Sequence, residues 1–320
     1  MINVYFSYDY ELMWGVWPFK GDSYISRNVT NANAALAACL VSHQSAEIPA
    51  NVAIVGGLLD DSHPREIIWL QNPNKAKRHK LEAHLVHFSR MKHLWKISAW
   101  LRRALQSNPY VEIGSHSYGH IFAHDATKAQ LELDFAKQAH AFNDAFGLTP
   151  KFLILPKNQV TADALEIAKR YEYREVRVNP DNWVSAPERK GWRTRLLRLL
   201  DAYLPIQELV RNKPLPFENP RLLEGRFFFR PVHWFAALDW LHFQRLKIGF
   251  YYCRATKRDF HIWTHPHNMG ADISRAQSNL RRIFAWLKEK ALSGEVQFCR
   301  MAPAKPRVEA GKDSFEKQAI

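Results

Sequence analysis

Two histidines and two carboxylates are the residues of this chain whose types and spacing could do chemistry. His116 and His120 lie four residues apart, just after the mostly apolar run Tyr110–Ile113. Neutral imidazoles at this spacing can bind one metal ion, and a carboxylate beside them completes a two-histidine, one-carboxylate set with a position left for water. Asp9 and Glu11, which end an apolar segment near the N-terminus, offer that carboxylate. This combination favours a metal-dependent hydrolase.

A further histidine pair follows another expected strand. The segment Phe260–Asn268 has the pattern of a strand running into a turn that contains His265, Pro266 and His267. Acidic and imidazole groups at the ends of several strands are typical of a barrel active site. We therefore expect this turn to lie near Asp9.

The elements that must position these residues follow from the hydrophobic pattern, in which short apolar runs alternate with longer amphipathic ones. This alternation predicts parallel β/α units and an irregular α/β barrel. The expected strands are Ile2–Tyr8, Asn51–Val55, Tyr110–Ile113, Lys151–Leu155, Glu175–Val178, Arg258–Thr264 and Glu295–Phe298. The expected helices lie near Thr30–His43, Leu81–Gln106, Thr127–Phe146, Thr161–Arg170 and Ile273–Lys288, with Thr127 as an N-cap and Gly147 as a stop.

Two regions depart from this alternation. Residues 184–250 are rich in proline and aromatic side chains, and we interpret them as an insertion packed over the barrel mouth of a single domain, 1–301. Residues 302–320 are polar and contain proline and glycine, which predicts a disordered tail.

Four short segments resemble the motifs of a known family. The chain is similar to polysaccharide deacetylases of the NodB-homology type (carbohydrate esterase family 4), and in particular to a divergent branch whose first motif is Asp-x-Glu. The segments that carry the resemblance are Ser7–Glu11, His116–His120, Leu155–Gln159 and Trp263–His265. The resemblance covers most of residues 2–183 and 257–270, and the second motif is its most specific part.

The resemblance implies a distorted (β/α)7-type barrel and removal of the N-acetyl group from an amino sugar in a saccharide or polysaccharide precursor. It implies that Glu11, His116 and His120 bind a divalent metal, zinc before cobalt or nickel. Asp9 is then the general base toward the water that the metal activates. His265 is the general acid, since imidazole titrates close to neutral pH.

Some assignments within this set stay open. Asp9 could be the ligand and Glu11 the base, and His267 is the rival of His265 or a substrate contact. Lys157 stands where the family has arginine, and it could pair with Asp9. The candidate substrate-binding residues are Lys157, Asn158, Trp183 and His267, and the family's fourth motif is only suggested by Asp181–Trp183.

Composition limits the partners. The formal charge of +14 favours an acidic partner, and no nucleic-acid-binding motif accompanies it. The basic segment 188–200 has leucines at near-helical spacing, so it could lie on an anionic membrane or pack its leucines on the barrel. Cys39, Cys253 and Cys299 are odd in number and far apart, as in a reducing compartment.

The N-terminus and the apolar runs bear on location. No basic region followed by an apolar run precedes the first strand, and the longest apolar stretch, Ala34–Val41, is too short to span a bilayer. These features predict a cytoplasmic protein, peripheral to the inner face of the membrane if the basic segment binds there.

Two alternatives remain for function: hydrolysis of another amide, such as a formamide or a cyclic imide, or a catalytically silent glycan- or membrane-binding component of polysaccharide biosynthesis.

Overall fold

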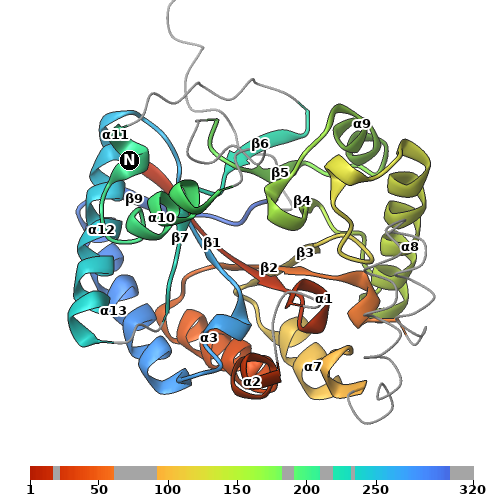
Figure 1. Cartoon of the computed structure of the whole chain (residues 1–320), viewed down its shortest axis with the longest axis horizontal. Helices are drawn as coiled ribbons and strands as arrows, with labels where there is room; N and C mark the ends of the chain where they lie inside the picture. The colour runs from red at the N-terminus through yellow and green to blue at the C-terminus, as the bar shows by residue number, and fades with distance from the viewer. Residues whose placement is uncertain (17–21, 61–91, 182–190, 210–218, 232–234, 303–320) are drawn as a thin grey trace, which may run out of the picture.

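One parallel sheet curls through the centre of the molecule, and helices surround it (Figure 1). The computed structural model describes residues 1–16, 22–60, 92–181, 191–209, 219–231 and 235–302. Every strand pairing within these residues is parallel, and the strands follow the order β6-β5-β4-β3-β2-β1-β8-β7.

The first strand lies in the middle of this sheet. β1 (Ile2–Tyr10) pairs with β2 (Ala50–Ile54) on one side and with β8 (Phe260–Thr264) on the other. Almost all of its residues are buried, as expected of a central parallel strand that is covered on both faces. β9 (Val296–Phe298) pairs with the first three residues of β1. Because Val4 pairs with both Phe298 and Phe260, β9 lies on the edge of β1 opposite β8.

The remaining strands continue the sheet from β2. They are β3 (Val111–Ser115), β4 (Phe152–Ile154) and β5 (Glu175–Val178). β3 and β4 share a single residue pair, Ser115 with Leu153, so the sheet is distorted there.

One interrupted strand closes the barrel. β6 (Arg221–Glu224) pairs with β5, and β7 (Phe227–Phe228), two residues later, pairs with β8. Because only Gly225 and Arg226 separate them, the two ends of the sheet order meet at this segment. Residues 221–228 therefore occupy one position between β5 and β8, and the sheet is a barrel of seven positions with β9 as an addition. The expected (β/α)7-type barrel is confirmed.

Five helices of the described residues connect successive strands on the outside. They are α3 (Ala32–Ala46), α8 (Lys128–Phe146), α9 (Ala162–Arg170), α12 (Ala236–Ala255) and α13 (Ile273–Leu292). The expected ends of α8 are confirmed, since Thr127 forms a capping box with Gln130 and Gly147 adopts the left-handed conformation. The other helices are α1 (Met13–Val16), α2 (Asp22–Tyr24), α7 (Ala99–Ser107), α10 (Trp192–Leu200) and α11 (Ile206–Leu209).

Three expectations differ from the structure or lie outside it. Residues 184–250 were expected to be an insertion, but they include β6, β7 and most of α12, which are parts of the barrel. The helix expected near Leu81–Gln106 is confirmed only over its last residues, as α7 (Ala99–Ser107). A short turn and an extended stretch precede α7, and residues 81–91 lie outside the described residues. Nearly all of the tail 302–320 lies outside the described residues. No helix in the described ranges is long and apolar enough to cross a membrane.

Candidate metal centre and active site

The carboxyl end of β1 supplies both acidic residues of the site. Asp9 and Glu11 are separated by one residue, so both side chains leave the same face of the extended chain. Both are buried. Gly15, one turn further in α1, makes room for Glu11, because a Cβ there would lie 1.9 Å from the Glu11 carboxyl carbon. The sequence thus leaves space for the Glu11 carboxylate.

The loop after β3 delivers His116 and His120. Ser117 and His120 adopt left-handed backbone conformations, both with φ of 59°, and these bends turn the loop back on itself. The carboxylate of Asp134 on α8 holds the loop, accepting hydrogen bonds from the backbone N–H groups of Tyr118 (2.7 Å) and Gly119 (2.9 Å).

The two imidazoles converge on one oxygen of Glu11. His116 Nε2 lies 3.2 Å and His120 Nε2 2.9 Å from Glu11 Oε2. Ligand bonds of 2.0–2.1 Å in a tetrahedral zinc site place neighbouring ligand atoms about 3.3 Å apart. The three side chains therefore have the spacing of a metal ligand set.

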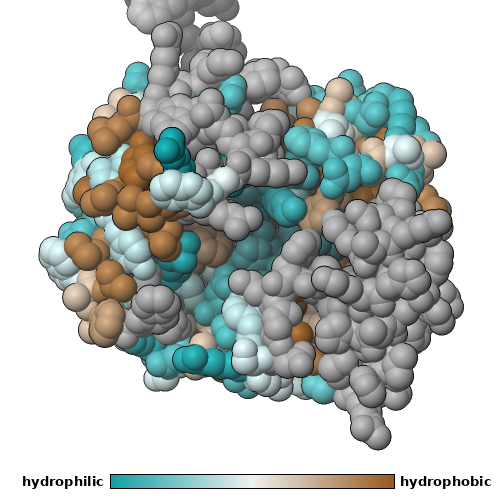
Figure 2. All heavy atoms as spheres, viewed as in Figure 1, coloured by the Kyte–Doolittle hydropathy of each residue, from teal (hydrophilic) through white to brown (hydrophobic). Residues whose placement is uncertain are grey.

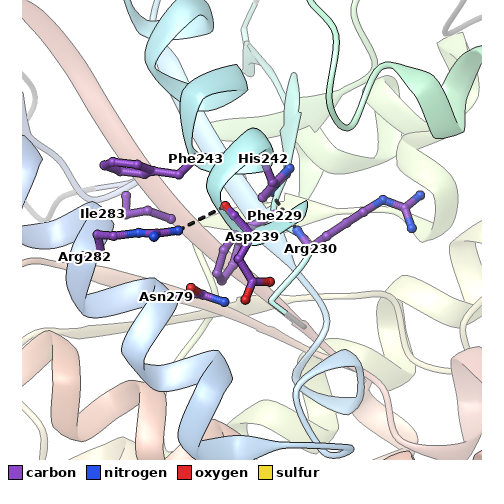
Figure 3. Close-up of a pocket in the computed structure, with 8 residues that line it drawn as sticks. All are labelled: Phe229, Arg230, Asp239, His242, Phe243, Asn279, Arg282 and Ile283. Atoms are coloured by element: carbon purple, nitrogen blue, oxygen red, sulfur yellow. Dashed lines mark hydrogen bonds between the residues drawn. The ribbon is translucent and has the colours of Figure 1, made fainter. Parts of the chain in front are cut away.

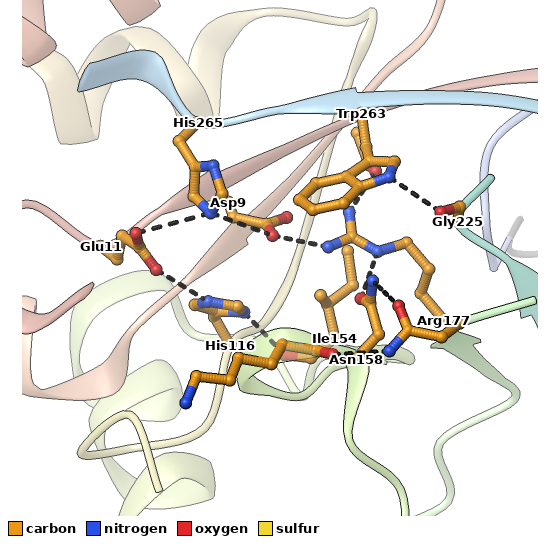
Figure 4. Close-up of polar contacts among 12 residues, drawn as sticks. Asp9, Glu11, His116, Ile154, Asn158, Arg177, Gly225, Trp263 and His265 are labelled. Atoms are coloured by element: carbon orange, nitrogen blue, oxygen red, sulfur yellow. Dashed lines mark hydrogen bonds and ion pairs between the residues drawn. The ribbon is translucent and has the colours of Figure 1, made fainter. Parts of the chain in front are cut away.

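The hydrogen bond of His116 Nδ1 shows that a cation is needed between His116 Nε2 and Glu11 Oε2. His116 Nδ1 lies 2.7 Å from the backbone oxygen of Ile154, which can only accept, so Nδ1 carries a hydrogen (Figure 4). In the neutral ring, Nε2 then presents a lone pair to Glu11. A lone pair and a carboxylate oxygen at 3.2 Å need a cation between them, either a proton or a metal ion. The donor set fits a divalent metal such as zinc.

Electrostatics agrees with a cation-binding site. Burial by itself would raise the pKa of Glu11, but the nearby His265, His116 and His120 hold it well below its usual range. Burial lowers the pKa of His120. Burial also acts to lower the pKa of His116, but the Glu11 and Asp9 carboxylates raise that pKa above its ordinary value. Glu11 is therefore an anion inside the barrel, and a cation there would offset the cost of burying its charge.

A second pair of imidazoles faces the other oxygen of Glu11. His265 Nε2 lies 3.5 Å and His267 Nδ1 3.8 Å from Glu11 Oε1, and the two rings stack with centroids 4.9 Å apart. Glu11 thus belongs to two groups with ligand spacing, one with His116 and His120 and one with His265 and His267. His265 Nε2 also lies 3.8 Å from Asp9 Oδ2, so it touches both carboxylates.

Asp9 forms its shortest contact with an arginine of β5. Arg177 donates from one terminal nitrogen to Asp9 Oδ2 at 2.5 Å, and both side chains are buried (Figure 4). Burial raises the pKa of Asp9, but the Arg177 guanidinium, together with His116 and His265, brings it below the ordinary value. Asp9 is therefore ionised at neutral pH.

Three contacts fix the guanidinium of Arg177. Its Nε donates to Asn158 Oδ1 and its other terminal nitrogen to Ser7 Oγ, both at 2.8 Å. Its plane lies over the Trp263 ring, 4.3 Å from the centroid. Gly225 borders this side chain, because a Cβ there would come within 2.9 Å of it. The interrupted strand thus leaves space for a large cation inside the barrel.

Sequence reasoning missed Arg177 and assigned its task to Lys157. The arginine partner of Asp9 comes from β5, whereas the Lys157 ammonium lies 3.8 Å from the centroid of the Phe122 ring. A charged residue in the buried strand Glu175–Val178 was the available signal, because a long cation is buried only when it is paired.

The other three candidate substrate-binding residues are Asn158, His267 and Trp183, and two of them lie in the described structure. The Asn158 amide is used to hold Arg177 and to donate to Asn179 Oδ1 at 3.0 Å, so it positions the arginine. His267 lies against Glu11 and His265. Trp183 lies outside the described residues. Binding of substrate by any of these stays a prediction.

A small cavity elsewhere is not a substrate site. It lies between α12 and α13, is lined by residues that include Asp239, His242 and Arg282 (Figure 3), and has a volume of about 10 Å³. That volume is close to the lower limit for one water molecule, so no sugar fits there.

Comparison with known sequences gives one family. Residues 45–176 match the family described as polysaccharide deacetylase. The match includes His116 and His120, whereas Asp9, Glu11 and His265 lie beyond its ends. No curated protein matches the chain.

Solved structures share the fold at low sequence identity. A protein from Mycobacterium smegmatis, described as a polysaccharide deacetylase, has a TM-score of 0.56 at 11% identity, over 93% of this chain and 87% of that one. One from Pseudomonas aeruginosa, described in the same way, has a TM-score of 0.50 at 12% identity, over 93% and 88%. An allantoinase has a TM-score of 0.50 at 12% identity, over 93% and 87%. These likenesses support the same barrel fold.

Proposed function

We propose that this chain, which its match over residues 45–176 assigns to the polysaccharide deacetylase family, is a metal-dependent hydrolase that removes the N-acetyl group from an amino sugar. The observation that carries the proposal is the convergence of two imidazole nitrogens on one oxygen of a buried, ionised Glu11. That arrangement beside a second carboxylate and a third imidazole supplies a ligand set, a base and an acid.

Glu11, His116 and His120 are the proposed ligands. A divalent ion bound there would supply Lewis-acid activation of a water molecule and of the amide carbonyl. Glu11 is favoured over Asp9 as the ligand, because both imidazoles lie within 3.2 Å of Glu11 while Asp9 is engaged by Arg177. The Ile154 carbonyl holds the His116 ring with its Nε2 lone pair toward Glu11.

Asp9 is the proposed general base. Arg177 occupies Oδ2, while Oδ1 is buried and has no hydrogen-bonding partner among the described residues. An ionised oxygen in that condition can accept a proton from the attacking water. Arg177 also fixes the direction in which the Asp9 carboxylate points.

His265 is the proposed general acid. Its ring is partly exposed and its Nε2 lies near both carboxylates, so it can reach a substrate that enters from solvent. Transfer of a proton from Nε2 to the departing amine nitrogen would release the amino sugar and acetate.

Hydrolysis of another amide on the same site is the second candidate. The barrel fold is shared with an allantoinase, so a cyclic amide is the natural comparison substrate. A catalytically silent glycan-binding role is the third reading, and the intact base, acid and ligand constellation argues against it.

The test combines metal content with product analysis. We expect purified protein to hold about one equivalent of zinc, cobalt or nickel, and His116→Ala/His120→Ala to lose it while still folded. His124→Ala/His140→Ala, which removes two exposed histidines, is the matched control and should retain the metal. Release of acetate from N-acetylated sugars, with none of the ring-opened product from allantoin, would support the proposed substrate class.

Other results of the metal analysis would change the proposed metal site or overturn the mechanism. Metal kept by His116→Ala/His120→Ala but lost by His265→Ala/His267→Ala would move the ion to the second ligand group. No metal in the wild-type protein after reloading with each of the three ions would overturn the mechanism.

A further inference from the structure

The apolar side of α10 faces solvent. Trp192, Leu196, Leu199 and Leu200 follow helical spacing and share one face of the helix. Trp192 is 70% exposed, and Leu196 and Leu199 are each 45% exposed. An amphipathic helix ordinarily buries such a stripe, whereas here a large part of each of these side chains is in solvent.

The start of α12 extends the same surface. Phe235 (67% exposed), Trp240 (55%) and Leu241 project large apolar side chains there. The turn after α10 packs on α12, since His242 Nδ1 donates to the Ala202 backbone oxygen at 2.7 Å. Figure 2 shows hydrophobic residues gathered at the place that α10 to α12 occupy in Figure 1. The α10–α12 surface comprises Trp192, Leu196, Leu199, Leu200, Phe235, Trp240 and Leu241.

Positive charges accompany this apolar surface. Arg193 and Arg198 are exposed on α10 between the apolar residues, and the whole chain carries a formal charge of +14. Leucine and tryptophan side chains beside arginines are typical of helices that lie in the headgroup region of a bilayer. A second copy of this chain would bring like charges together, which disfavours a dimer at this surface.

The surface lies on the same side of the barrel as the candidate active site. The segment that leads to α10 leaves the carboxyl end of β5, and α12 begins shortly after the carboxyl end of β7. Asp9, Glu11 and His265 stand at the carboxyl ends of β1 and β8, and the strands are parallel. The first turn of α12 is therefore on the same side of the barrel as the catalytic cluster.

We propose that the α10–α12 surface docks the protein on an anionic phospholipid bilayer. The apolar side chains enter the headgroup region, and Arg193 and Arg198 contact lipid phosphates. If the proposed deacetylase function also holds, the acetylated sugar is carried on a membrane amphiphile, which presents it at the barrel entrance. Docking itself does not depend on that function.

Flotation of the full chain with lipid vesicles tests the docking. We expect binding to vesicles that contain phosphatidylglycerol and little binding to pure phosphatidylcholine. Leu196→Gln/Leu199→Gln/Leu200→Gln should abolish the binding, and Leu133→Gln/Leu292→Gln, at exposed leucines of α8 and α13, should leave it unchanged. Arg193→Gln/Arg198→Gln should weaken it by about 25-fold, since each basic group contributes up to about 1 kcal/mol. Arg103→Gln/Lys169→Gln is the matched control for lost charge.

Three results would overturn the proposal. The first is absence of wild-type binding to anionic vesicles at low salt, and the second is equal loss in the control variants. The third is a dimer in solution that the triple leucine variant converts to monomers, because the surface would then be an interface between copies. Each readout is independent of hydrolysis, so failure of docking leaves the deacetylase proposal standing.

Discussion

At the scale of single residues, Arg177 links β5 to the candidate active site at the end of β1. Its guanidinium contacts Asp9 and Ser7 of β1 and Asn158 of the loop after β4. Both partners of the Asp9–Arg177 pair are almost fully buried. Removing one partner of such a pair leaves an uncompensated charge in the interior, which costs more than the pair itself contributes.

We expect Arg177→Met to lower the free energy of unfolding by about 3–5 kcal/mol at neutral pH, because Asp9 stays buried and charged. Adding Asp9→Asn to this variant should recover much of the loss, since the unpaired charge is then gone. Urea unfolding of the two single variants and the double variant measures this coupling.

An exposed ion pair provides the control for this cycle. Arg170 and Glu132 lie 2.6 Å apart with both side chains largely in solvent. Arg170→Met should change the free energy of unfolding far less than Arg177→Met. Equal effects of the two substitutions would mean that the Asp9–Arg177 pair is not buried in solution.

At the scale of elements, α8 controls the loop that carries the histidines. Asp134 faces this loop, and burial raises its pKa to about 6, although the N–H groups of Tyr118 and Gly119 lower it. Since this pKa lies above the ordinary 3.8, the folded protein binds a proton at Asp134 where the unfolded chain does not. The stability that this proton contributes is complete below pH 3.8 and is lost as the pH rises through about 6.

The free energy of unfolding of the wild-type protein, minus that of Asp134→Asn, should therefore fall as the pH rises from about 4 to about 7. The full decrease is about 3 kcal/mol. Urea unfolding at several pH values in this range gives the difference directly. Asp163→Asn, at an exposed carboxylate in the first turn of α9, should give a difference that does not change in this way. A constant difference for Asp134→Asn would show that Asp134 is not buried.

Elements with strong local signals were predictable from sequence, and those without them were not. The N-cap Thr127 and the stop at Gly147 defined α8, and the apolar run that starts at Ile2 predicted the strand β1 but not its central position in the sheet. β6 and β7 are too short, at 4 and 2 residues, to show a strand period, so residues 184–250 were misread as an insertion. The histidine loop and the acidic pair were found from residue type and spacing. Arg177 was not, because its role depends on β5 and β1 meeting across the barrel.

At the scale of the whole molecule, the proposed ligands join distant parts of the chain. Glu11 and His116 are 105 residues apart in sequence. An ion that binds only when β1 and the loop after β3 are in place favours the folded state by mass action.

Zinc at about 100 times its dissociation constant should stabilise the folded protein by about 2.7 kcal/mol, which raises Tm by about 4 °C for a chain of this size. Differential scanning calorimetry with zinc and with a chelator measures the shift. His116→Ala/His120→Ala should show no shift. A rise of the same size in that variant would place the stabilising ion elsewhere.

The central position of β1 has a consequence for synthesis of the chain. Val4 pairs with Phe260, so one edge of the first strand to leave the ribosome lacks its β8 partner until most of the chain has been made. At about 5–20 residues per second, that edge stays open for about ten seconds or longer. Its buried, apolar residues are then exposed to other nascent chains, and a chaperone that covers this segment would protect the barrel until translation reaches β8.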